Sequence, residues 1–154
     1  MRLDTRVSEA MTGAVFYEDV VIGAELPPLA KHPTTQQLVK WANASGDYNE
    51  IHYDKDYAQR AGLKGVIVHG RLGLSWLGQL ITGWMGVDGT LKRIEVSYRK
   101  MVYPDTDVVC RGKVIEKYTQ DSEHLIKLEI WLESSGGERV TQGTAVVSLP
   151  SRDN

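Results

Sequence analysis

Hydrophobic and polar residues along the first half of the chain repeat at the spacing of helices. Thr34, followed three positions later by Gln37, forms a capping box, and apolar side chains then recur on one face until Gly46. We therefore expect a helix that begins at Thr34 and ends at Gly46. A shorter helix is expected from Asp54, whose carboxylate accepts the free N–H groups of a first turn, to Gly62. The residues of this shorter helix that we expect to face inward are Tyr57, Ala58 and Ala61.

An uncharged apolar run follows His69 and Gly70 and extends from Leu72 to Val87. Its large side chains recur at every fourth position, which is the stripe of a helix buried against a sheet. These side chains are Leu72, Trp76, Leu80 and Trp84, with Leu77 and Ile81 beside them. The run is shorter than the roughly 20 residues that cross a bilayer, so we interpret it as a buried helix. Its glycines predict a close approach to the sheet, at Gly73, Gly78 and Gly83.

From Leu91 onward the repeat changes to two, which is the period of strands with one covered face. Four such strands are expected, near residues 94–98, 108–115, 126–133 and 139–149, and a short one near residues 25–31. Alternation in successive strands indicates an antiparallel sheet. The only element long and apolar enough to cover one face of this sheet is the helix after Gly70. The prediction is an α+β chain in which a curved antiparallel sheet wraps around one long central helix, the hot-dog fold.

Composition narrows the function classes. We expect residues 1–154 to form one domain, with residues 1–14 as a loose leader that lacks the apolar run of a signal peptide. Eighteen Lys and Arg against twenty Asp and Glu give a net charge of −2, so neither a nucleic acid nor a membrane is expected as a partner. Cys110 is the only cysteine, which excludes an intrachain disulfide and fits a reducing, cytoplasmic location. Because the sequence has no nucleotide motif or metal-ligand spacing, we expect no cofactor and no metal.

The densest cluster of reactive side chains is the segment 45–52, after the first predicted helix. A carboxylate, Asp47, and an imidazole, His52, lie five residues apart there. On an irregular loop such a pair can converge on one small molecule and can hold and ionise a water. The alternative is structural: Asp47 caps a helix and His52 donates to a backbone carbonyl.

A second feature is Val68-His69-Gly70, at the start of the predicted buried helix. Free N–H groups at a helix N-terminus suit a developing oxyanion, and glycine at position 70 lets a bound carbonyl come close. His69 is interpreted as a packed histidine that orients the turn, with proton transfer as the alternative.

Several short motifs agree with one family. They are Ser45-Gly46-Asp47-x-Asn49-x-Ile51-His52, Tyr57-Ala58, Val68-His69-Gly70 and Ser75. With them the chain resembles, from about Tyr17 to Leu149, the MaoC-like dehydratases, the family of the (R)-specific enoyl-CoA hydratases. The resemblance implies subunits that pair as hot-dog dimers. It also implies the site residues: Asp47 and His52 as the catalytic pair, the Gly70 amide as the oxyanion hole, and Asn49 and Ser75, with His69 beside them, in supporting roles.

The chain departs from the family pattern at two positions. Glu50 stands where the family usually has proline, and Arg71 follows the His-Gly pair, where an apolar residue is expected. A cation at a helix N-terminus is unfavourable by about 0.3–1 kcal/mol when it is exposed. We expect Arg71 to pair with Glu50. The alternative is that Arg71 faces a polar or carboxylated acyl group and determines substrate specificity.

Two further groups have a functional and a structural interpretation. A basic group beside the strand after the long helix suits the phosphates of coenzyme A or an acidic carrier protein, or else it is a solvated strand face. It consists of Lys92, Arg93, Arg99 and Lys100. Trp76, Trp84 and Met85 either line an acyl tunnel or, as their helical spacing favours, fill the core.

The resulting hypothesis is a hydro-lyase of fatty acid metabolism that interconverts 2-enoyl and (R)-3-hydroxyacyl thioesters of coenzyme A or an acyl carrier protein. A hot-dog acyl-CoA thioesterase is one rival. It normally carries its carboxylate on the central helix, and residues 72–87 contain no Asp or Glu. We expect a homodimer, and the other rival is a subunit of a heteromeric dehydratase.

Overall fold

The computed structural model describes residues 13–153, so the predicted leader lies almost wholly outside the described residues. The helices are α1 (Thr35–Ser45), α2 (Lys55–Arg60) and α3 (Gly70–Met85), with short 3₁₀ turns η1 (Tyr17–Asp19) and η2 (Glu50–His52). The strands are β1 (Leu29–Lys31), β2 (Thr90–Tyr98), β3 (Val108–Gln120), β4 (Glu123–Ser134) and β5 (Arg139–Ser148). None of the helices in this range is long and apolar enough to cross a membrane.

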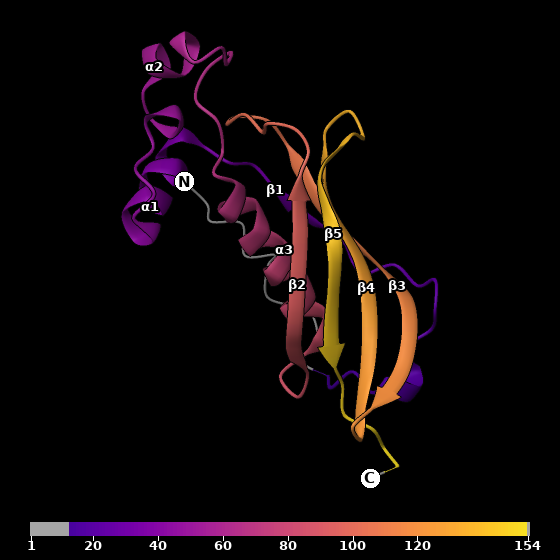
Figure 1. Ribbon diagram of the computed structural model, residues 1–154. Helices are drawn as coiled ribbons and strands as arrows, with labels where there is room; N and C mark the ends of the chain where they lie inside the picture. The colour runs from indigo at the N-terminus through magenta and orange to yellow at the C-terminus, as the bar shows by residue number, and fades with distance from the viewer. Residues whose placement is uncertain (1–12, 154) are drawn as a thin grey trace, which may run out of the picture.

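The five strands form one antiparallel sheet in the order β1-β3-β4-β5-β2. Figure 1 shows this sheet curving, with α3 lying along one of its faces and with α1 and α2 grouped beyond the first turn of α3. Within the described residues β2 is an edge strand, because it pairs only with β5. The α+β architecture that the hydrophobic periods predict is confirmed.

The helix boundaries follow from the capping residues. The Thr34 hydroxyl accepts the N–H of Gln37 at 3.2 Å, and Gly46 ends α1 in the left-handed conformation with φ 75°. Asp54 caps α2 by accepting the N–H of Tyr57 at 2.9 Å. Ala58 is buried as expected.

The expected inward positions of Tyr57 and Ala61 are wrong. Tyr57 is 40% exposed, and Ala61 is exposed at the C-cap position, after the helix has ended. A helix of six residues makes fewer than two turns, so only one of its residues, Ala58, is buried.

The core lies between α3 and the concave face of the sheet. The buried side chains of α3 are Leu72, Trp76, Leu77, Leu80, Ile81 and Met85. They pack with sheet residues that include Cys110, Val114, Leu128, Ile130 and Val147. Truncating a buried leucine of this set to alanine typically costs about 2–5 kcal/mol of stability.

Two details of the core differ from the sequence prediction. Of the three predicted glycines only Gly73 approaches the sheet, because a Cβ there would lie 3.4 Å from Leu132, whereas Gly78 and Gly83 have open space around them. The predicted strand near residues 25–31 pairs as β1 only over Leu29–Lys31, with one isolated bridge at Glu25. Pro27 and Pro28 interrupt it, because proline has no N–H for the ladder.

Candidate active site

The turn that carries His52 is held by side chains of its own loop. After α1 ends, the Asn49 side chain accepts the N–H of Ile51 at 3.2 Å and thereby caps η2, whose last residue is His52. The Asp47 carboxylate accepts the N–H of Asn49 at 3.4 Å. Asn49 therefore supports the turn, and its side chain is exposed.

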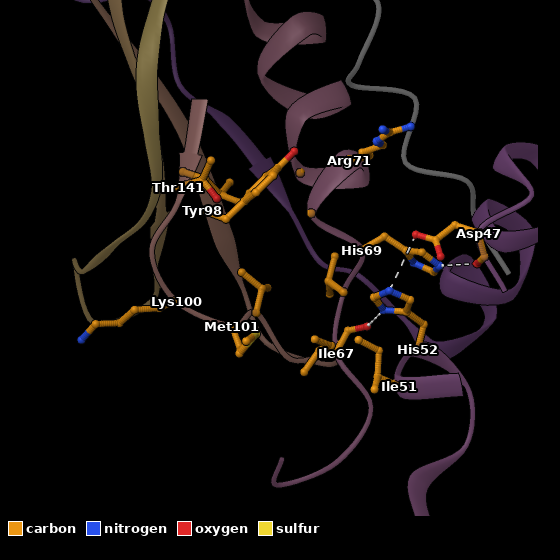
Figure 2. Close-up of a pocket in the computed structure, with 15 residues that line it drawn as sticks. Asp47, Ile51, His52, Ile67, His69, Arg71, Tyr98, Lys100, Met101 and Thr141 are labelled. Carbon is orange, nitrogen blue, oxygen red and sulfur yellow. Dashed lines mark hydrogen bonds and ion pairs between the residues drawn. The ribbon is translucent and has the colours of Figure 1, made fainter. Parts of the chain in front are cut away.

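Asp47 and His52 meet across this loop. Asp47 Oδ2 lies 3.8 Å from His52 Nε2, as the dashed line in Figure 2 marks. His52 is 7% exposed, whereas the Asp47 side chain is 43% exposed. His52 Nδ1 lies 2.7 Å from the Ile67 carbonyl oxygen, which only accepts, so Nδ1 carries the hydrogen. In the neutral ring Nε2 is then an unprotonated base that faces the carboxylate.

His69 packs directly on His52. The two imidazole rings stack with centroids 3.7 Å apart and planes inclined by 19°. His69 is 1% exposed, and its Nε2 donates to the Asp47 carbonyl oxygen at 3.2 Å, while its Nδ1 is buried without a partner among the described residues. Burial, and then the neighbouring His52, lowers the pKa of His69 below its ordinary value. The environment of His69 thus favours its neutral form, and its ring joins His52 to the Asp47 loop.

The same three side chains do not form a good metal site. Asp47, His52 and His69 each offer a ligand atom within 4.8 Å of the others. However, imidazole lone pairs lie in the ring plane, and two nearly parallel stacked rings do not aim them at one point. One nitrogen of each ring is also engaged by a backbone carbonyl.

The first turn of α3 supplies free amides. The His69 carbonyl accepts the first intrahelical bonds, from Leu72 at 3.0 Å and Gly73 at 3.3 Å. The N–H groups of Gly70 and Arg71 precede these bonds and have no acceptor within the helix. A Cβ at position 70 would lie 3.0 Å from the Tyr98 ring, so that ring occupies the space beside the helix start.

One cavity of about 310 Å³ brings these groups together. Asp47, His52, His69 and Gly70 line it, and Figure 2 shows Tyr98 and Thr141 facing them from the sheet. Its apolar walls are Ile51, Ile67, Val68, Met101, Val102 and Leu132. The sequence did not indicate that Tyr98, Leu132 and Thr141 of the sheet line the cavity, since only the pairing register of the strands brings them there.

Ser75, Glu50 and Arg71 differ in their relation to the cavity. The Ser75 hydroxyl donates back to the Leu72 carbonyl oxygen at 2.7 Å, and Ser75 does not line the cavity. Glu50 and Arg71 are both exposed and make no ion pair with each other, so the expected pairing is wrong. Glu50 starts η2 outside the cavity lining, whereas Arg71 lies on the lining.

The two remaining groups lie on the surface of the sheet and in the core, and of them only Lys100 lines the cavity. In the basic group, Lys92 pairs with Glu123 at 2.8 Å, Arg93 pairs with Glu95 at 2.6 Å, and Lys100 pairs with Glu138. Three of its four side chains thus form exposed ion pairs, as on a solvated strand face. The residues considered for an acyl tunnel, Trp76, Trp84 and Met85, lie in or against the core and do not line the cavity.

Comparison with known proteins relates the chain to MaoC-like proteins. A family model described as "MaoC like domain" matches residues 19–134. The 3-oxo-4,17-pregnadiene-20-carboxyl-CoA hydratase beta subunit of Mycobacterium tuberculosis (strain ATCC 25618 / H37Rv) is 28% identical over 134 residues, which is 87% of this chain and 98% of that protein.

Solved structures agree in fold. The (R)-hydratase from A. caviae involved in PHA biosynthesis matches with a TM-score of 0.78 and 23% identity, over 86% of this chain and 99% of that chain. The ChsH1-ChsH2 complex from Mycobacterium tuberculosis matches with a TM-score of 0.74 and 25% identity, over 84% of this chain and 98% of that chain. The predicted hot-dog fold is thereby confirmed.

Proposed function

Because the chain belongs to the MaoC-like family of hydratases and dehydratases, we propose that it is a hydro-lyase that interconverts 2-enoyl thioesters and (R)-3-hydroxyacyl thioesters. The observation that carries the proposal is the approach of His52 Nε2 to the Asp47 carboxylate, 3.8 Å away, on one cavity. Acyl thioesters as substrates, and the (R) configuration, come from the family and its relatives.

In the hydration direction His52 acts as the general base. Its Nε2 takes a proton from a water held between His52 and Asp47, and the water oxygen adds to Cβ of the enoyl group. The electron pair of the double bond moves through Cα onto the thioester oxygen. The proton on His52 Nε2 passes to the Asp47 carboxylate and from there to Cα, so that both side chains end in their starting protonation states.

The first turn of α3 is proposed to bind the enolate oxygen. The Gly70 N–H has no acceptor within the helix and lies at the positive end of its dipole. The thioester oxygen gains charge only as the reaction proceeds, so this donor stabilises the transition state more than the bound substrate.

Asn49 and His69 are proposed to position the reacting groups. Asn49 caps the turn that ends at His52, and His69 joins the His52 ring to the Asp47 carbonyl. Neither needs to exchange a proton with the substrate in this scheme. Ser75 takes no part in it, because its hydroxyl is engaged by the backbone of its own helix.

A second copy of the chain is the proposed partner. Strand β2 is an edge of nine residues, and an unpaired edge is a template for another strand. A heteromer is the alternative, supported by the relative described as a beta subunit and by the solved ChsH1-ChsH2 complex.

A panel of 2-enoyl-CoA thioesters tests the proposed reaction. We expect loss of the conjugated-enoyl absorbance on addition of the enzyme, with (R)-3-hydroxyacyl-CoA as the product on chiral chromatography. A parallel assay for free coenzyme A thiol tests the rival hydrolysis. Thiol release without loss of the double bond would replace the hydratase proposal with a thioesterase.

A further inference from the structure

Three residues from neighbouring strands form one row across the wall of the cavity. In the sheet Leu132 of β4 is paired with Thr141 of β5, and Thr141 is paired with Tyr98 of β2. Residues directly opposite in antiparallel strands project on the same face. All three line the cavity, with Thr141 in the middle of the row.

Two glycines of α3 face this row. Gly70 and Gly73 are three residues apart and therefore lie on one side of the helix. A Cβ on Gly70 would lie 3.0 Å from the Tyr98 ring, and a Cβ on Gly73 would lie 3.4 Å from Leu132. The two ends of the row thus contact the glycine face of α3, and Thr141 lies between these two contacts.

Thr141 is a polar residue in an apolar wall. It is 4% exposed and lines the cavity, and among residues 13–153 no other side chain or backbone group hydrogen-bonds its hydroxyl. A hydroxyl at a cavity wall can exchange a hydrogen bond with water for one with a bound ligand. Valine has nearly the same shape but can make no such hydrogen bond. The hydroxyl is therefore available to a ligand in the cavity.

We propose that Thr141 is a specificity residue that hydrogen-bonds an oxygen substituent on the acyl chain of the substrate. A hydroxyl both donates and accepts, so an acyl chain with a keto or a hydroxyl group satisfies it. The preferred substrates are then oxygenated 2-enoyl thioesters rather than simple alkyl ones of the same length. This inference rests on the proposed hydratase function and names the substrate class of the same site.

The test compares substrates that differ in one oxygen. We would measure kcat/KM on 2-hexenoyl-CoA and on its 5-oxo and 6-hydroxy analogues, for the wild type, Thr141→Val and Thr141→Ser. We expect the wild type to prefer at least one oxygenated analogue by roughly three- to tenfold, the ratio that one neutral hydrogen bond supplies. Thr141→Val should lose this preference, mainly through turnover of the oxygenated substrate, and Thr141→Ser should keep it.

Thr144→Val is the matched control. Thr144 lies on the same strand but does not line the cavity, so its substitution should leave the preference unchanged. Melting temperatures of all variants report on folding. Equal preferences in the wild type and Thr141→Val would overturn the role of Thr141.

Binding separates this inference from the proposed function. If the wild type turned over none of the enoyl-CoA thioesters, the proposed reaction would fail. Calorimetric titration with hexanoyl-CoA and 5-oxohexanoyl-CoA would still test Thr141, because neither ligand needs to react. A preference for the oxo ligand that is lost in Thr141→Val supports the specificity role, and equal affinities contradict it.

Discussion

The imidazole rings of His52 and His69 stack at 3.7 Å, and each ring has one nitrogen against a backbone carbonyl. His52 is bound to the Ile67 carbonyl, and His69 is bound to the Asp47 carbonyl. The stack thereby connects the segment before α3 with the loop after α1. The orientation of the proposed base thus depends on the segment before α3 as well as on its own loop.

Asp47→Asn and His52→Ala should each lower the hydration rate by at least about 10²-fold, because general acid–base groups typically contribute 10²–10⁴. Steady-state kinetics on the best enoyl-CoA substrate measures this loss. Circular dichroism should report an unchanged fold. Near wild-type turnover in both folded variants would show that this pair does not carry the chemistry.

His69→Phe should lower kcat roughly tenfold with little change in KM, because the planar ring remains but the donor to the Asp47 carbonyl is lost. His69→Gln, which restores an N–H donor near the same place, should recover part of the rate. If both variants lost activity equally and only through KM, His69 would not position the catalytic pair.

Stability should fall in acid because of His69. Burial and the neighbouring His52 lower the pKa of His69 from 6.5, so between the lowered pKa and 6.5 the unfolded chain binds a proton that the folded chain does not. The free energy of unfolding therefore falls as the pH drops below about 6.5. Urea unfolding at pH values from about 7.5 to 5.5 measures the slope. His69→Phe should have a shallower slope than the wild type, and identical slopes would contradict the assignment.

Arg71→Met should leave the melting temperature nearly unchanged, because Arg71 is exposed and makes no ion pair with Glu50. Arg71 lines the cavity, so the substitution should shift preference from carboxylated or polar enoyl-CoA thioesters toward aliphatic ones. Differential scanning calorimetry and the substrate panel give the two readouts. A destabilised variant with an unchanged substrate ranking would show instead that Arg71 stabilises the fold and does not determine specificity.

Sedimentation equilibrium should give a dimer at micromolar concentration, because β2 is a nine-residue edge strand. Activity should follow the dimer as the protein is diluted. A stable and fully active monomer would contradict the proposed pairing of two copies.

The features that the sequence predicts correctly are local ones. The side chains of Thr34 and Asp54 cap the N–H groups of residues three positions later. Such a short spacing can be recognised in one sequence without an alignment. The same is true of Asp47 and His52, which one short turn brings together. The periods of two and of 3.6 residues predict the sheet and the long helix, since each period follows from backbone geometry.

The features that the sequence does not predict depend on distant pairings. Leu132, Thr141 and Tyr98 share the cavity wall only because of the registers of β4, β5 and β2. These registers include irregularities at Leu91/Arg93 and Leu132/Glu133 that no local pattern indicates. The pairing of Glu50 with Arg71 was expected from charge alone, and in the structure only Arg71 lines the cavity.

Tyr98 connects the edge strand β2 with the proposed oxyanion site. It is the last residue of β2, and its ring lies against Gly70 at the proposed oxyanion site. A second chain that paired with β2 would order this end of the strand and hold the ring in place. Association and substrate binding would then be thermodynamically linked. By reciprocity, substrate would tighten the assembly by the same factor as the assembly tightens substrate binding.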